Sequence, residues 1–74
     1  RFHTAMGRYR LAMQFLEEIG AAPGVRAHAY AGLGYAMACL ERWKDSCTTL
    51  MRGREVGDPV WSCICDDMLR SLEA

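Results

Sequence analysis

The sequence predicts an all-α fold of about four helices that pair as antiparallel hairpins. Large apolar residues recur three and four positions apart along the chain, which is the spacing of one face of a helix. Glycine and proline interrupt this pattern where a helix would end or begin. No stretch alternates between apolar and polar residues as a half-buried strand does. With 74 residues, the chain is long enough for one small domain.

The first part of the chain predicts a helix that ends at Ile19. Residues 1–6 are expected to end an earlier helix, and Gly7 is expected to mark the turn that follows it. Gly20 is a suitable terminator, because glycine readily adopts the left-handed conformation that closes many helices. The buried stripe of this helix is predicted to be Tyr9, Ala12, Met13, Leu16 and Ile19.

The second helix is expected over about 25–40. It follows a loop at 21–24, in which Pro23 is placed to start a helix. Leu33 is expected to face Leu50 of the next helix, and Gly34 to mark a close approach of the two helices. The predicted buried face is Tyr30, Leu33, Met37 and Leu40.

The third and fourth helices are expected on either side of Gly57. The third follows a turn at 41–42 and has the apolar side Trp43, Ser46, Cys47, Leu50 and Met51. The fourth begins at Pro59, after the N-cap residue Asp58, and ends near Glu73. Its predicted packing residues are Trp61, Ile64 or Cys65, Met68 and Leu72.

A spacing of 34 residues relates the third predicted helix to the first. It separates Tyr9 from Trp43, Ala12 from Ser46, and Leu16 from Leu50. Beyond Gly57 the spacing becomes 35, which pairs Leu33 with Met68 and Met37 with Leu72. The chain thus divides into a partial unit 1–24, a full unit 25–58 and a partial unit 59–74. Because such units bury a core only by stacking, we expect a segment of a longer solenoid.

The central part of the chain reads Tyr30-x-x-Leu33-Gly34-x-x-Met37, followed by Trp43-x-x-Ser46-x-x-x-Leu50. With the 34-residue spacing, this pattern resembles the tetratricopeptide repeat (TPR) family over nearly the whole chain. Met37, Ser46 and Leu50 stand where that family prefers Tyr, Ala and Phe, so the match is degenerate. The resemblance implies a helix-hairpin solenoid that acts as a protein-interaction or assembly scaffold.

A second family shares the hairpin architecture. Pentatricopeptide repeat (PPR) units have 35 residues and bind single-stranded RNA, and the late 35-residue spacing resembles them. The alternative function is therefore a segment of an RNA-associated organellar ribonucleoprotein complex. However, the base-reading positions fall on Ala31, which offers no side-chain hydrogen bond, and on the acidic Asp66. Nine basic and nine acidic residues leave no net charge, so RNA is not the favoured partner.

The TPR resemblance implies that the first helix of each unit lines a concave groove. Tyr35 is the best candidate anchor there, because aromatic side chains dominate many interfaces. The acidic residues of the groove predict a basic, amphipathic protein partner. A clamp for a chaperone carboxylate is not expected, since Arg70 is the only basic residue at these positions. The predicted groove positions are His28, Ala31, Gly32, Tyr35, Ala38, Cys39, Asp66, Asp67, Arg70 and Glu73.

Leu11 and Phe15 predict a second surface. They lie 34 residues before Asp45 and Thr49, so the first unit is apolar where the second is expected to be solvated. An exposed apolar patch of this kind is usually buried in a contact with another surface. A neighbouring repeat, a partner protein or a locally thicker core would each provide one.

The residues do not predict an enzyme, a cofactor or a metal site. Cys63 or Cys65 with His28 would give a nucleophile and a base, but no third group orients the base. On a helix, Cys63 and Cys65 point about 200° apart, and Asp66 and Asp67 about 100° apart, so neither pair suits one metal ion. We expect reduced thiols that act as small packing residues.

The hydropathy of the chain does not predict a membrane protein. No apolar run approaches the roughly 18 residues of a spanning helix, and no charged-then-apolar leader is present. We therefore expect an intracellular protein, with the cytoplasm favoured and an organelle as the alternative, whose partners are proteins or neighbouring repeats.

Overall fold

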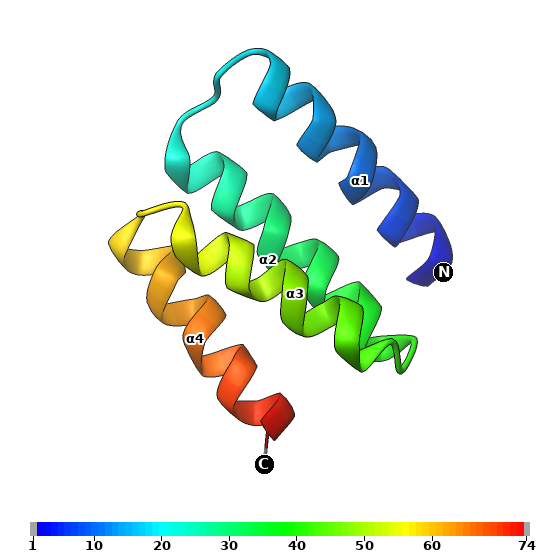
Figure 1. Ribbon diagram of the computed structural model, residues 1–74. Helices are drawn as coiled ribbons and strands as arrows, with labels where there is room; N and C mark the ends of the chain where they lie inside the picture. Colours follow the sequence, from blue (N-terminus) through cyan, green and yellow to red (C-terminus); the bar gives the residue numbers. More distant parts are fainter. Residues whose placement is uncertain (1, 74) are drawn as a thin grey trace.

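The computed structural model describes residues 2–73, which form four α-helices and no strand. They are α1 (Phe2–Glu18), α2 (Pro23–Cys39), α3 (Trp43–Glu55) and α4 (Pro59–Glu73). Consecutive helices run antiparallel, with the α1–α2 and α3–α4 connections at the same end of the molecule (Figure 1). The predicted all-α class and helix number are confirmed. The predictions for Arg1 and Ala74 fall outside the described residues.

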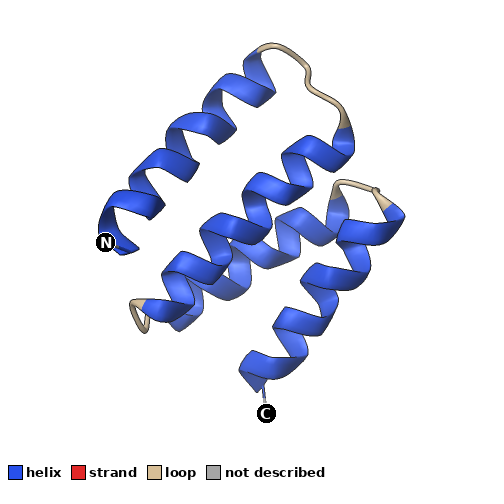
Figure 2. Cartoon of the chain, turned by 180° about the vertical axis from the view of Figure 1, so that it is seen from behind, coloured by secondary structure: helices blue, strands red, loops and turns tan. Residues whose placement is uncertain are grey.

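Helix α2 is the centre of the fold. It contacts each of the other three helices, while α1 and α4 lie at opposite edges (Figures 1 and 2). Its two sides bury two apolar clusters. Met6, Leu33, Ala36 and Met37 form the cluster between α1 and α2, and Ala31, Leu50, Cys65 and Leu69 form the cluster between α2, α3 and α4.

The turns follow from glycine, proline and an N-cap. Gly20 and Gly57 have φ angles of 65° and 98°, which glycine adopts without steric cost. Pro23 occupies the first turn of α2. The Asp58 carboxylate accepts a hydrogen bond from the Trp61 backbone N–H at 3.0 Å, so the predicted N-cap of α4 is confirmed.

The predicted turn at Gly7 is wrong, because α1 continues through this residue without a break. Apolar residues keep their helical spacing across Gly7, from the buried Met6 to the half-buried Tyr9 and Met13. Packing of this stripe on α2 outweighs the roughly 1 kcal/mol that one glycine costs inside a helix.

Several predicted faces also need correction. Trp43 and Met51 are 52% and 44% exposed, and Ile19 is 58% exposed, although all three were expected to be buried. Thr49 is 8% exposed rather than solvated, because α2 covers it. Leu33 and Leu50 lie in different clusters and do not face each other.

The spacing between α2 and α4 is 36 residues rather than the predicted 35. Leu33 and Leu69, 36 residues apart, are both buried, and Pro23 and Pro59 both open their helices. When Tyr9 is aligned with Trp43, α3 ends three residues later than α1 does. The connection between α3 and α4 is one residue shorter than the connection between α1 and α2. The main packing residue in the second half of α4 is therefore Leu69, which the sequence pattern did not single out.

Candidate interaction surfaces

An apolar cavity of about 270 Å³ opens between α2, α3 and α4. We call it the α2–α4 groove. Small residues on α2 and α4 make room for it, and Leu50, which is 1% exposed, belongs to its lining. It is lined by Gly34, Tyr35, Ala38, Ser46, Leu50, Met68, Ser71 and Leu72.

Tyr35 is the large aromatic residue of this groove. Its side chain is 58% exposed, whereas the neighbouring Ala36 is buried. The nearby thiol of Cys39, one helical turn further along α2, raises the pKa of Tyr35 above its usual value of 10.0. The phenol therefore stays neutral at physiological pH and offers an apolar ring with a polar tip to a partner.

The serine hydroxyl groups that line the groove are already paired. Ser46 is fully buried, and its hydroxyl donates to the carbonyl oxygen of Gly34 at 2.7 Å. The Ser71 hydroxyl donates to the Asp67 carbonyl oxygen at 3.2 Å. An apolar side chain can enter this groove without leaving these hydroxyl groups unpaired.

The other predicted groove residues of α2 lie in three different environments. Ala31 is 5% exposed and packs in the cluster with Leu50 and Leu69, so in this structure it is a packing residue. Gly32 lies beneath the ring of Tyr9. His28 is exposed at the opposite end of α2, where its ring packs against Trp61 with the centroids 4.8 Å apart.

The acidic residues of α4 do not act as one group. Asp66 lies between two arginines, with one carboxylate oxygen 3.2 Å from Arg54 and the other 3.0 Å from Arg70. Asp67 and Glu73 are exposed, and within residues 2–73 neither forms an ion pair. If a partner brings a positive charge to α4, Asp67 is therefore better placed to receive it than Asp66.

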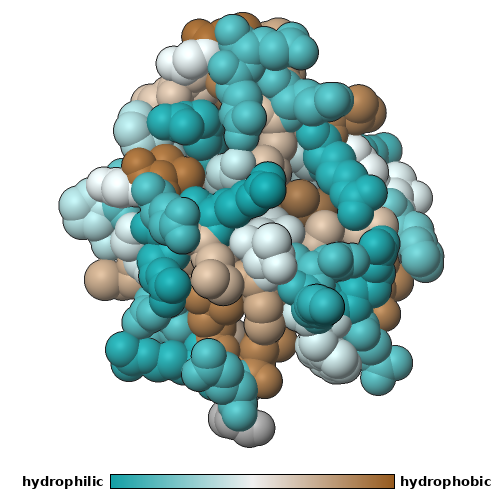
Figure 3. Space-filling model, viewed as in Figure 1, coloured by the Kyte–Doolittle hydropathy of each residue, from teal (hydrophilic) through white to brown (hydrophobic). Residues whose placement is uncertain are grey.

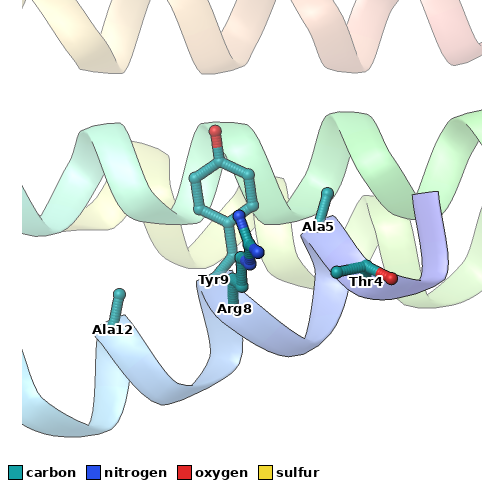
Figure 4. A pocket seen from close by; sticks show the side chains of 5 residues that line it. All are labelled: Thr4, Ala5, Arg8, Tyr9 and Ala12. Atoms are coloured by element: carbon teal, nitrogen blue, oxygen red, sulfur yellow. The ribbon is translucent and has the colours of Figure 1, made fainter. Parts of the chain in front are cut away.

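Leu11 and Phe15 on α1, and Ile19 directly after its end, are exposed large apolar residues. Leu11 and Phe15 are 69% and 58% exposed, so the predicted patch is accessible. A shallow hollow beside it is lined by Thr4, Ala5, Arg8, Tyr9 and Ala12. Figure 4 shows the Tyr9 ring extending from α1 across α2, with Ala5 and Ala12 on either side of it.

Most of the surface around α3 is hydrophilic. In the view of Figure 3, hydrophobic residues appear as separate patches between hydrophilic ones. The exposed residues of α3 include Lys44, Asp45, Thr48 and Arg52.

The cysteines are present as free thiols. Burial raises the pKa of the Cys65 thiol, which packs in the second cluster, so this group is protonated at neutral pH. Among residues 2–73, no three His, Cys, Asp or Glu side chains gather as metal ligands would. None of the described helices is long and apolar enough to cross a membrane.

The sequence pattern missed two features of these surfaces. It assigned Met68 and Leu72 to packing alone, although both also line the α2–α4 groove. The small residues Ala38 on α2 and Ser71 on α4, which also line that groove, were the available signal. The hydrogen bond from the Tyr30 hydroxyl to Glu17, at 2.6 Å, also had no counterpart in the predictions.

No protein-family model, curated protein or solved structure matches the chain.

Proposed function

We propose that this chain is a non-catalytic protein-interaction or assembly scaffold built from TPR-like helical hairpins. In this proposal the α2–α4 groove holds an apolar side chain of a protein partner. The observation that carries the proposal is the apolar cavity of about 270 Å³ beside the exposed Tyr35. Exposed aromatic residues beside a small pocket are typical anchors of protein interfaces.

The size of the groove favours a side chain over a small molecule. Small-molecule sites usually enclose about 300–1,000 Å³, with convergent polar groups that fix the ligand. This groove is smaller, and the hydroxyl groups of Ser46 and Ser71 are paired with backbone oxygens. One aliphatic or aromatic side chain of a partner suits such a site.

The charge of α4 supports a basic partner. Asp67 and Glu73 are exposed on the helix that forms one wall of the groove, and neither is paired within residues 2–73. A lysine or arginine next to the apolar anchor would approach them. We therefore propose an amphipathic helix with a basic side as the partner.

Titration with two synthetic peptides tests this proposal. The first places leucines on one face of a helix and lysines on the other, and the second has glutamate in place of each lysine. The leucine–lysine peptide should bind more tightly, and Tyr35→Ala should weaken it by about 1–3 kcal/mol. Asp67→Asn should mainly slow association and reduce its salt dependence.

Phe15→Ala is the matched control, because Phe15 is also 58% exposed but lies on α1. It should leave the affinity unchanged. If both peptides bind equally, or if Tyr35→Ala has no effect on the lysine peptide, the groove is not the interaction site and the proposal fails.

A further inference from the structure

A hollow lies between α1 and α3, above α2. Both helices pack on α2, and in the described part of the chain they do not pack on each other. Two cavities of about 420 and 350 Å³ occupy the space between them. We call these two cavities the α1–α3 hollow, because they share the lining residues Arg10, Met13, Leu33 and Arg52.

The floor of the α1–α3 hollow is apolar and buried. It includes Tyr30, Leu33 and Met37 of α2, which are 7%, 5% and 4% exposed. A charge above this floor has protein rather than water on one side. Its attraction to an opposite charge is therefore stronger than it would be on an open surface.

Two arginines from different helices line both cavities of the hollow. Arg10 belongs to α1 and Arg52 to α3, and both are exposed. Within residues 2–73, neither forms an ion pair. A guanidinium group presents its N–H donors as a planar fork that matches the two oxygens of a carboxylate. The walls of the hollow thus carry two cations that have no anion between them.

The acidic residues that line the hollow already have partners. A carboxylate oxygen of Glu17 accepts the hydrogen bond from the Tyr30 hydroxyl at 2.6 Å. Asp45 forms an ion pair with Arg42 at 2.8 Å. Three arginines and two acidic residues line the hollow in total, so its net charge is +1.

We infer that the α1–α3 hollow binds the carboxylate of an acidic side chain from a protein partner, held between Arg10 and Arg52. One carboxylate balances the charge of the hollow. A nucleic-acid strand would instead lay several phosphates across a surface that includes Glu17 and Asp45, and these like charges would repel it. None of the residues that line the hollow also lines the α2–α4 groove, so the inference does not depend on that groove.

A neighbouring hairpin or a second copy of the chain suits the hollow less well. Helices α1 and α4 lie at opposite edges of the molecule (Figure 1), so a hairpin added at either edge leaves the space between α1 and α3 open. In a second copy, the exposed acidic residues of α4 are Asp67 and Glu73, and each is one helical turn from the exposed Arg70. Docking of α4 would therefore bring Arg70 towards the arginines of the hollow.

Two peptides of ten residues serve as probes. Both consist of glycine and serine, with glutamate at every second position in one and glutamine in the other. Neither contains leucine, so neither has an apolar anchor for the α2–α4 groove. At low ionic strength, where exposed charges attract most strongly, the glutamate peptide should shift the side-chain N–H signals of Arg10 and Arg52 in NMR spectra of the labelled chain. The glutamine peptide should bind at least about tenfold more weakly.

Variants of the chain then test the site. Arg10→Gln and Arg52→Gln should each weaken the glutamate peptide by about tenfold, because a charge-assisted hydrogen bond is lost. Arg52→Lys keeps the charge without the planar fork, so it should weaken the peptide less than Arg52→Gln does. Arg8→Gln is the matched control. It removes the same charge from α1, but Arg8 lines the separate hollow at Tyr9, so the affinity should stay within about twofold. Circular dichroism checks that each variant keeps its helices.

Four results would overturn the inference. Equal binding of the two peptides would show that the carboxylate is not recognised, and equal losses in Arg8→Gln and Arg52→Gln would show that only the overall charge matters. If a ten-nucleotide oligouridylate binds more tightly than the glutamate peptide and Arg52→Gln abolishes this binding, the hollow is a phosphate site. If sedimentation shows a dimer that Arg52→Gln dissociates, a second copy occupies the hollow. Tyr35→Ala should leave the glutamate peptide unaffected, which separates this test from that of the α2–α4 groove.

Discussion

Gly34 and Leu50 approach so closely that a Cβ atom at Gly34 would lie 2.6 Å from the Cγ and Cδ2 atoms of Leu50. Leu50 is 1% exposed and cannot move away easily. Gly34→Ala should therefore lower the free energy of unfolding by about 1–3 kcal/mol, as overpacking of a core usually does. Chemical denaturation measures this change.

Gly7→Ala is the control for that substitution. Gly7 lies inside α1, and a Cβ atom there would meet nothing within 4 Å. Alanine should raise the stability by about 0.5–1 kcal/mol, because it loses less backbone entropy in a helix. A destabilising Gly7→Ala would contradict a continuous α1 and restore the turn that the sequence predicted.

Glu41 predicts a stabilising substitution. It has a φ angle of 59° in the turn between α2 and α3, a left-handed conformation that is costly for residues other than glycine. Glu41→Gly should raise the free energy of unfolding by up to about 1 kcal/mol. Glu55→Gly, at the last residue of α3, should not raise it, because Glu55 does not have a positive φ angle. Thermal melts of both variants compare the two effects, and a loss of stability in Glu41→Gly would count against this turn.

Tyr30 predicts a loss of stability at high pH. Burial and its hydrogen bond to Glu17 raise the pKa of Tyr30 above 10.0. The folded state then holds the phenolic proton more tightly than the unfolded state does. The resulting stabilisation is complete below the unfolded pKa and is lost as the pH rises through the folded one.

Stability measured from roughly pH 9 to 11 should therefore fall less steeply in Tyr30→Phe than in the starting chain. Some decline should remain, because burial raises the pKa of Cys65 in the same direction. Identical slopes in the two proteins would show that Tyr30 is not protected in this way.

Asp66 predicts a small, salt-dependent contribution to stability. It pairs with Arg54 and Arg70 at 3.2 and 3.0 Å, but all three side chains are at least 32% exposed. Asp66→Asn should therefore cost no more than about 1 kcal/mol, and less at high salt. Asp67→Asn should have no measurable effect on stability. Urea titrations at two salt concentrations measure the free energy of unfolding of both variants. If Asp66→Asn and Asp67→Asn changed it equally, the ion pairs of Asp66 would not contribute to stability.

Periodicity and turn residues were sufficient to predict most of the fold. The spacing of apolar residues, together with Gly20, Pro23, Gly57 and the N-cap Asp58, predicted four helices and three of their boundaries. The turn predicted at Gly7 was wrong because the neighbouring residues in the sequence do not distinguish a glycine inside a helix from a glycine in a turn. The left-handed Glu41 had no local signal, because its conformation is imposed by the packing of α2 on α3.

The candidate surfaces were harder to predict because burial depends on more than one neighbour. Tyr35, Leu11 and Phe15 are exposed, as expected. Ala31 was predicted on the same groove, but α4 packs over it. Asp66 was expected to face a partner, but Arg54 of α3 approaches it from a position 12 residues away in the sequence. Contacts between residues of different helices leave no periodic pattern in the sequence, so the spacing of residues does not predict them.

The most direct test of the proposed scaffold function is an NMR map of the leucine–lysine peptide on the isotopically labelled chain. The proposal predicts that chemical shifts change most at the residues of the α2–α4 groove: Tyr35, Ala38, Met68, Ser71 and Leu72. It also predicts that these changes disappear in Tyr35→Ala. Shift changes confined to Leu11, Phe15 and Ile19, with none at Tyr35, would contradict it.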